Sequence, residues 1–141
     1  MATTWTTAIR GHFFDISDVA DSAEEIAQRA RSLEDGLLFL DGGRIVSLVP
    51  WEEGCAQLRH ENDYQDYRGK LIVPGFVDSH IHYPQTEMIG AYGEQLLTWL
   101  ENYTFPVEGQ YHSPDHAARM SAFFLNQLLA NGTTTALVFG T

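Results

Sequence analysis

Two apolar runs in the second half of the chain place the strongest limit on its fold. Residues 75–81 show no polar alternation that would suit a half-exposed strand, and residues 133–141 (TTTALVFGT) form a second such run. Runs of this kind are typical of strands buried on both faces of a parallel sheet. A long helical connection separates them, which indicates a parallel pair joined by a right-handed crossover. The sequence therefore predicts an α/β fold.

The connection between the two runs carries clear helix signals. Ser113 suits an N-cap, Pro114 the first helical position, and Gly132 the end of the helix. Residues 94–103 form a shorter helical patch, which a loop at Pro106 should follow. The buried face of the long helix is expected to hold Met120, Phe123, Phe124, Leu128 and Leu129.

The N-terminal region is predicted to form a small antiparallel β unit. Two β-rich runs flank a DGG turn that tolerates positive φ, so residues 36–50 are predicted to form a hairpin. Residues 7–14 suit a further strand, and residues 18–35 suit a short helix with acids in its first turn.

The chain thus divides into two expected parts, residues 1–70 and residues 71–141. Two parallel strands alone leave apolar surface with nothing to pack against, because a parallel sheet has more strands and is covered on both faces. Either the chain is a fragment, or its remaining strands come from another chain. The packing argument favours a fragment.

Composition excludes several classes of protein. Apolar residues make up 44% and charged residues 19% of the chain, which is globular rather than disordered. The formal net charge of -11 repels phosphate backbones, so we expect no nucleic-acid partner, and no Lys/Arg run suggests a membrane surface. Cys55 is the single cysteine, which excludes an internal disulfide and fits a reducing compartment. With no signal peptide or spanning segment visible, a cytoplasmic location is expected.

His80 and His82 stand at the end of the first apolar run. Side chains at positions i and i+2 of a strand point the same way, roughly 6–7 Å apart at Cα, so the two imidazoles can converge on one cation. Imidazole binds zinc and iron, and barrel enzymes keep their active sites at the carboxyl ends of parallel strands. The alternative is a pair of ordinary loop histidines. Asp78 shares the face and is expected to orient the strand end by hydrogen bonds, with a capping role as the alternative.

Two histidines do not complete a catalytic zinc site, which usually has three protein ligands and an open position for water. His12 and His60 are expected at the surface of the β unit. His116 can be a ligand, although a solvated or capping role is favoured. The third ligand and a carboxylate general base are therefore expected beyond Thr141, and no catalytic residue is assigned within the chain.

The stretch PGFVDSHIH, residues 74–82, resembles the metal-binding signature of the amidohydrolase superfamily. The resemblance implies a metal-dependent (β/α)8 barrel with a small β-sandwich built from both ends of the chain. Residues 1–70 would then be the N-terminal half of the sandwich. Residues 71–141 would be the first βαβ portion of the barrel, which is incomplete in this chain.

Three further stretches are similar to guanine deaminases of this superfamily: HYPQ at 82–85, LLTWLENYTFPVE at 96–108 and NGTTTALVFGT at 131–141. The resemblance implies hydrolytic deamination of guanine by water to xanthine and ammonia. It also implies a zinc cofactor, with iron as the alternative, and a homodimeric full-length protein.

The same resemblance assigns site residues. It implies that His80 and His82 bind the metal. It implies a purine site lined by His82, Tyr83, Pro84 and Gln85. The Gln85 amide offers a donor and an acceptor to a lactam edge, with a loop or capping amide as the alternative. Trp99 and Phe105 can wall the pocket, although core packing is at least as compatible with each residue.

Two other functional hypotheses are compatible with the sequence. Another aminohydrolase of the superfamily, related to chlorohydrolases or cytosine deaminases, would share the two histidines, although the YTFP stretch argues against it. A catalytically inactive fragment that binds metal weakly, or that pairs with a partner chain through its unpaired β edge, is the third hypothesis. The chain lacks a PCxxC pattern, which excludes the other zinc nucleobase deaminases.

Overall fold

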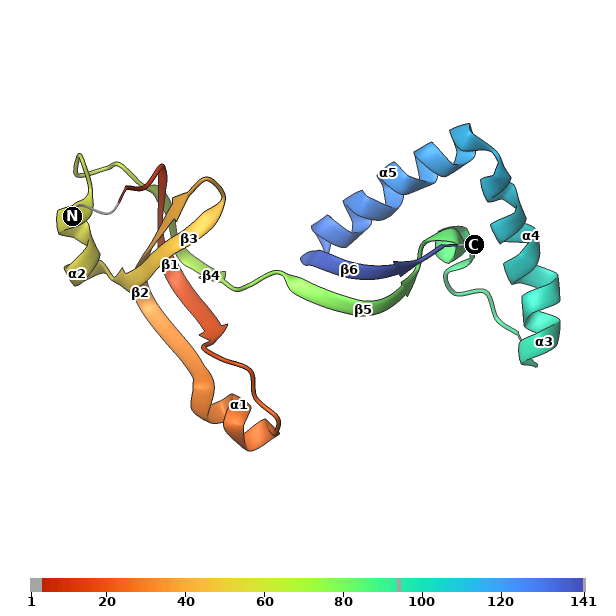
Figure 1. Cartoon of the computed structure of the whole chain (residues 1–141), viewed down its shortest axis with the longest axis horizontal. Helices are drawn as coiled ribbons and strands as arrows, with labels where there is room; N and C mark the ends of the chain where they lie inside the picture. The colour runs from red at the N-terminus through yellow and green to blue at the C-terminus, as the bar shows by residue number, and fades with distance from the viewer. Residues whose placement is uncertain (1–3, 94, 141) are drawn as a thin grey trace. The chain divides into compact units, whose positions relative to one another are not determined.

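A computed structural model of the protein describes residues 4–93 and 95–140. The chain divides into two compact units between Pro74 and Gly75. The first unit is built around one sheet, and the second around a pair of strands with helices packed on it. Figure 1 shows the elements of both units.

Four strands form the sheet of the N-terminal unit. They are β1 (Thr7–Ile16), β2 (Ala30–Asp41), β3 (Arg44–Pro50) and β4 (Gln65–Ile72). Their order is β3-β2-β1-β4, with antiparallel pairs except for β1 and β4, which are parallel. The predicted hairpin is confirmed as β2 and β3, joined through Gly42 and Gly43 at φ angles of 55° and 77°. Positive φ at both positions is what a two-residue turn of type I′ requires.

The connection between β1 and β2 differs from the sequence prediction. Only α1 (Ala23–Arg29) is helical, whereas residues 30–35 belong to β2, so the helix predicted over residues 18–35 was wrong for its last part. The antiparallel pairing of the two strands continues as far as Ile16 and Ala30. The apolar stripe of the expected helix is thin, and the hydrogen bonds of the strand pairing outweigh that weak local preference.

The core of the N-terminal unit gathers on one face of the sheet. Leu37 and Phe39, two residues apart on β2 and therefore on the same face, are 0% and 1% exposed. The ring of Phe39 packs on that of Trp5 at a centroid distance of 5.3 Å. Two short helical turns, α2 (Trp51–Gly54) and η1 (Cys55–Gln57), follow β3. Partly buried side chains complete the cluster: Val46, Val49, Trp51, Leu58 and Tyr64.

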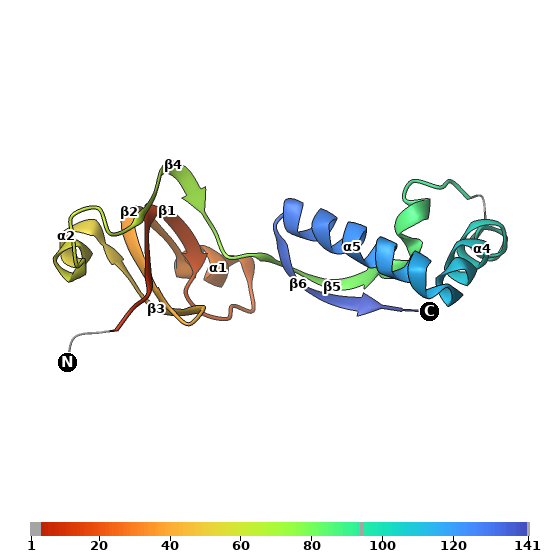
Figure 2. The same cartoon turned by 90° about the horizontal axis from the view of Figure 1, so that it is seen from above.

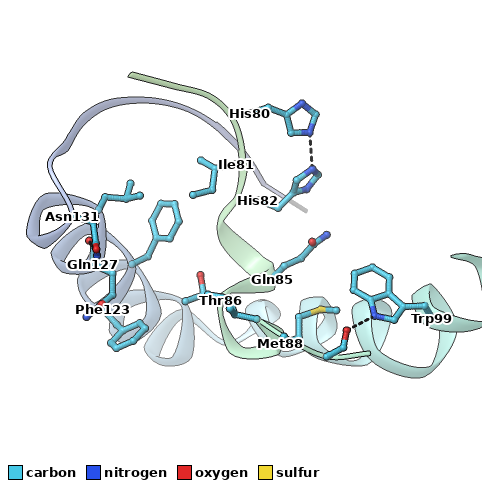
Figure 3. Close-up of a pocket in the computed structure, with 15 residues that line it drawn as sticks. His80, Ile81, His82, Gln85, Thr86, Met88, Trp99, Phe123, Gln127 and Asn131 are labelled. Atoms are coloured by element: carbon cyan, nitrogen blue, oxygen red, sulfur yellow. Dashed lines mark hydrogen bonds between the residues drawn. The ribbon is translucent and has the colours of Figure 1, made fainter. Parts of the chain in front are cut away.

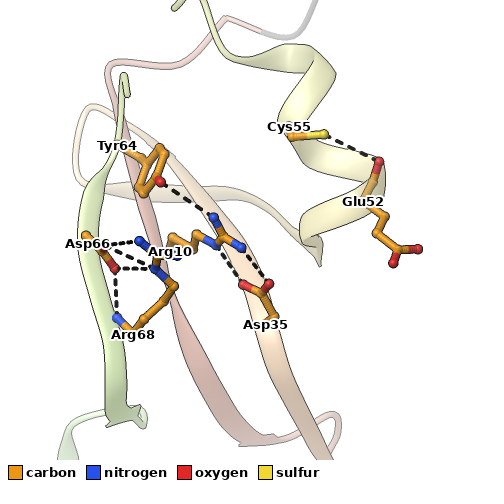
Figure 4. A network of polar contacts seen from close by, with 7 residues as sticks. All are labelled: Arg10, Asp35, Glu52, Cys55, Tyr64, Asp66 and Arg68. Atoms are coloured by element: carbon orange, nitrogen blue, oxygen red, sulfur yellow. Dashed lines mark hydrogen bonds and ion pairs between the residues drawn. The ribbon is translucent and has the colours of Figure 1, made fainter. Parts of the chain in front are cut away.

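Arg10 links β1 to Asp35 of β2 and to the ring of Trp51. Its guanidinium donates two hydrogen bonds of 2.7 Å to the Asp35 carboxylate (Figure 4), and its Cζ atom lies 3.5 Å from the centre of the Trp51 ring. Bidentate pairing and a cation–π contact both stabilise this arrangement. On β4, Arg68 pairs with the Asp66 carboxylate at 2.6 Å.

Acid is expected to destabilise the N-terminal unit. The hydrogen bonds from Arg10 lower the pKa of Asp35, and those from Arg68 lower the pKa of Asp66 to about 2. A carboxylate with a lowered pKa stabilises the fold above its unfolded pKa, about 3.9, and this stabilisation is lost as the pH falls through the folded pKa. The midpoint of thermal unfolding, followed by circular dichroism, should therefore fall between about pH 4 and about pH 2.

Asp35→Asn tests the origin of this pH dependence. The variant should have a lower unfolding midpoint at neutral pH and a shallower decline in acid, because the pairing with Arg10 is already weakened. Asp21→Asn, at an exposed position before α1, is the matched control and should follow the parent protein. An Asp35→Asn profile identical to that of the parent protein would contradict the assignment.

The C-terminal unit contains the predicted parallel pair. β5 (Phe76–His82) and β6 (Thr133–Phe139) are hydrogen-bonded in parallel, and α5 (Pro114–Ala130) lies along them (Figures 1 and 2). Gly132, at a φ of 83°, follows the helix as expected, and Ser113 precedes it with extended N-cap angles. Thr141, at the end of the predicted second strand, lies outside the described residues.

The burial predicted for these elements is found only in part. Phe76 and Val77 of β5 are 59% and 71% exposed. Of the five side chains expected to face the core from α5, Phe124 is buried, whereas Phe123 and Leu129 are 49% and 63% exposed. The physical reason is that two strands with one helix against them leave much of the sheet surface in contact with solvent.

The segment between β5 and α5 is more helical than predicted. It contains η2 (Tyr83–Met88), α3 (Leu96–Trp99), η3 (Leu100–Thr104), α4 (Phe105–Glu108) and η4 (Gly109–His112). The loop predicted at Pro106 was wrong, because Pro106 takes an early position of α4, where proline fits well. Glu94, at the start of the predicted helical patch, lies outside the described residues. Across the described ranges, no helix combines the length and the apolar character needed to span a membrane.

Candidate active site

β5 brings His80 and His82 together. Both imidazoles project from one side of the strand, while Ile81 points to the other side (Figure 3). This is the alternation that a strand imposes on successive side chains. The two Nε2 atoms lie 3.1 Å apart, so the convergence predicted from the spacing is confirmed.

The separation of the two rings fits a shared metal ion. Two histidine nitrogens, each roughly 2.1 Å from a tetrahedral zinc ion, lie about 3.4 Å from one another. The same separation suits a hydrogen bond between the rings, whose donor depends on the tautomer. Among the described residues, no group of three or more His, Cys, Asp or Glu side chains is placed to hold a metal. The pair therefore offers two ligands of a larger set.

Two neighbours hold the histidine pair in place. The Oδ1 atom of Asp78 accepts a hydrogen bond of 3.0 Å from the backbone N–H of His80, which fits both the predicted role at the strand end and the capping alternative. Phe139 of β6 contacts both rings, with centroid distances of 4.5 Å to His80 and 5.1 Å to His82. Because the parallel register pairs His82 with Phe139, the adjacent strand helps to orient both imidazoles.

Gln85 extends from η2 on the same side of the chain as the histidines (Figure 3). Its Nε2 atom donates a hydrogen bond of 3.0 Å to Oε1 of Glu108, at the end of α4. Glu108 lies in the stretch LLTWLENYTFPVE, but no site role for it was predicted from the sequence. The two residues are 23 positions apart, and no local periodicity connects them.

Tyr83 and Pro84 were expected to line the purine site, but the structure shows them in packing contacts. The Tyr83 hydroxyl donates to the Ala117 carbonyl at 2.7 Å and accepts from Ser121 Oγ at 3.0 Å, which joins η2 to α5. Pro84 is fully buried. Of the four expected residues, His82 and Gln85 line a hollow at the end of β5, and Tyr83 and Pro84 do not.

The side chain of His116 is mostly buried, so the expectation of a solvated residue was wrong, whereas the alternative capping role stays a prediction. Its side chain is 13% exposed, and its Nε2 lies 2.9 Å from Oε2 of Glu87, outside hydrogen-bond geometry. The ring of Tyr111 meets it edge-on at 4.9 Å. Burial raises the pKa of Tyr111, and the charge of Glu87 adds to this effect. These contacts also tie η2, which carries Gln85, to α5.

A hollow of about 620 Å³ surrounds the end of β5. Its lining falls on two sides of the chain (Figure 3): the histidines and Gln85 face one side, and side chains of α5 lie on the other. Trp99 contributes to the lining, and its Nε1 donates a hydrogen bond of 3.0 Å to the Ala91 carbonyl. Phe105, the other expected wall residue, is 57% exposed. The side that carries the imidazoles has the groups needed for metal-assisted chemistry.

Known proteins resemble the chain over nearly its whole length. It is 58% identical over 134 residues to guanine deaminase of Escherichia coli K12. The matched residues are 95% of this chain and 30% of that relative. The solved structure of the E. coli enzyme matches with a TM-score of 0.92 at 57% identity, over 96% of this chain and 32% of that one. A guanine deaminase of C. acetobutylicum, with guanine bound in the active site, matches with a TM-score of 0.76 at 26% identity, over 96% of this chain and 30% of that one.

The chain thus spans about a third of the length of the relatives it matches. The resemblance to guanine deaminases, predicted from the stretches HYPQ, LLTWLENYTFPVE and NGTTTALVFGT, is confirmed by these identities. Residues 71–141, which are half of the chain and include β5, α5 and β6, match the Amidohydrolase family. On this match and on the structural similarity, the chain belongs to the amidohydrolase family.

Proposed function

We propose that this chain contributes part of the active site of an enzyme that converts guanine and water into xanthine and ammonia. The observation that carries the proposal is the 58% identity to E. coli guanine deaminase over 95% of the chain. The convergence of His80 and His82 beside the Gln85 amide supports it. The activity is that of the full-length protein, because the chain spans about a third of these relatives.

His80 and His82 would hold a divalent metal ion through their Nε2 atoms, with zinc as the first candidate and iron as the second. Such an ion lowers the pKa of a coordinated water toward about 7 and so supplies a nucleophile at neutral pH. An imidazole binds a metal through the lone pair of a ring nitrogen, so both rings must be in the neutral form, not the protonated one. Phe139, which contacts both rings, would keep them oriented, and Asp78, which binds the backbone N–H of His80, would keep the strand end in place.

Gln85 would bind the lactam edge of guanine, where a ring N–H stands beside a carbonyl. A side-chain amide carries the complementary acceptor and donor. The flat ring of Trp99 would form an apolar wall of the site. In this proposal, residues 71–141 are the first βαβ portion of a (β/α)8 barrel, and its later strands supply the remaining ligands and the general base.

Turnover of guanine tests the proposal directly. The purified full-length protein should release xanthine and ammonia in equal amounts, measured by chromatography and an ammonia assay. A chelator should abolish the activity, and added zinc should restore it. No turnover of guanine, with clear turnover of a triazine or a hydantoin, would assign the protein to a different reaction within the family.

Gln85→Ala in the full-length protein should raise the KM for guanine by about tenfold or more, because a polar site that loses one partner leaves the substrate edge unpaired. Steady-state kinetics would measure this change against kcat. Gln127→Ala is the matched control and should keep the parent KM, because Gln127 belongs to α5 and lies on the other side of the chain from the histidines (Figure 3). Equal KM values for Gln85→Ala and the parent protein would contradict the substrate-binding role.

A further inference from the structure

Glu108 holds the Gln85 amide in one orientation. The hydrogen bond from Gln85 Nε2 to Glu108 Oε1 is 3.0 Å long, and both side chains are partly buried. An ionised carboxylate has only acceptor oxygens, whereas an amide has one donor end and one acceptor end. The amide NH2 group must therefore face Glu108, and the amide oxygen must point elsewhere.

Packing between helical elements keeps Gln85 and Glu108 beside each other. Glu108 ends α4, which packs against η2, the element that carries Gln85. η2 is itself joined to α5 through the Tyr83 hydroxyl and by the proximity of Glu87 to His116. Because both partners sit on packed elements, little side-chain freedom is lost when the hydrogen bond forms.

We propose that Glu108 is a positioning residue that sets the choice of purine by fixing the direction of the Gln85 amide. The inference rests on the proposed function, which places the reacting carbon beside the histidines and so gives the purine one orientation. With Nε2 anchored on Glu108, the Gln85 oxygen accepts from a ring N–H, and the second Nε2 hydrogen donates to the adjacent carbonyl. This order of acceptor and donor selects a lactam edge.

The same geometry rejects an aminopurine edge. In that edge a ring nitrogen accepts and the neighbouring amino group donates, so the Gln85 amide would have to reverse. Reversal would place its oxygen against the Glu108 carboxylate, which leaves two acceptors facing each other. A purine with the correct reacting amine but the reversed edge, such as 2,6-diaminopurine, should therefore bind poorly.

Glu108→Gln in the full-length protein tests this role, because the new amide accepts or donates equally well and no longer fixes Gln85. The KM for guanine should rise by about five- to tenfold while kcat changes by less than about twofold. Inhibition of guanine turnover by 2,6-diaminopurine should become stronger relative to the KM for guanine. Glu108→Asp, which keeps an acceptor-only group, should retain more of the selectivity than Glu108→Gln.

Two controls separate positioning from a general structural effect. Glu101→Gln, at an exposed position of η3, should leave the KM and the selectivity unchanged. In a double-mutant cycle, Glu108→Gln should add nothing further in a Gln85→Ala background, because the amide that it positions is gone. An equal loss in both backgrounds, or a fall in kcat that follows a lower unfolding midpoint, would overturn the positioning role.

The outcomes also distinguish this inference from the proposed function. A parent protein that deaminates guanine, with a Glu108→Gln variant of unchanged KM and selectivity, would overturn the inference and leave the proposed function intact. A parent protein that does not deaminate guanine would overturn both.

Discussion

His82→Ala in the full-length protein is expected to lower kcat for guanine by on the order of a thousandfold and to release the bound metal. The reason is geometric. His80 and His82 present their Nε2 atoms 3.1 Å apart, so the loss of one ring leaves a single imidazole from β5. Guanine turnover would give the kinetic effect, and inductively coupled plasma mass spectrometry would give the metal content per protein.

His60→Ala is the control for this experiment, because His60 is an exposed histidine of the N-terminal unit. It should retain the parent activity and metal content. A His82→Ala protein with full metal content and undiminished turnover would refute the assignment of the histidine pair, and the proposed chemistry would fail with it.

Phe39→Ala is expected to lower the free energy of unfolding by about 3–5 kcal/mol, which is the usual cost of removing a buried aromatic ring. Phe39 is 1% exposed and packs on the ring of Trp5 at the centre of the core cluster. Urea unfolding followed by tryptophan fluorescence would measure the change, since Trp5 reports on the same cluster.

Phe14→Ala provides the comparison within the same sheet. Phe14 lies on β1 and is 39% exposed, so its removal should cost less than about 1.5 kcal/mol. If the two phenylalanine variants had equal free energies of unfolding, the core would not be where the burial places it.

Several features of the fold could be predicted because they depend on residues close together in the sequence. The paired glycines at 42 and 43 adopt positive φ and close the hairpin, as the DGG turn indicated. Ser113 and Gly132 bracket α5, and the alternation along β5 places both histidines on one side. Each prediction relies on a preference that acts within one turn of helix or a few residues of strand.

The wrong predictions share a different cause. Residues 30–35 join β2 because β1 lies beside them, and this partner is not visible in the weak helical pattern of residues 18–35. Pro106 takes an early position of α4, which begins at Phe105, instead of marking a loop, since the preceding turns already follow a helical path. In both places, the surroundings outweigh the local preference.

The sequence by itself determined that two imidazoles share one face of a strand end and that the chain resembles amidohydrolases. Only the tertiary structure decided that Glu108 meets Gln85, that Phe139 contacts both imidazoles, and that Tyr83 turns to α5. These contacts join residues 23 to 59 positions apart. Strand periodicity acts between neighbours along the chain, whereas such distant pairs are selected by the packing of whole elements against one another.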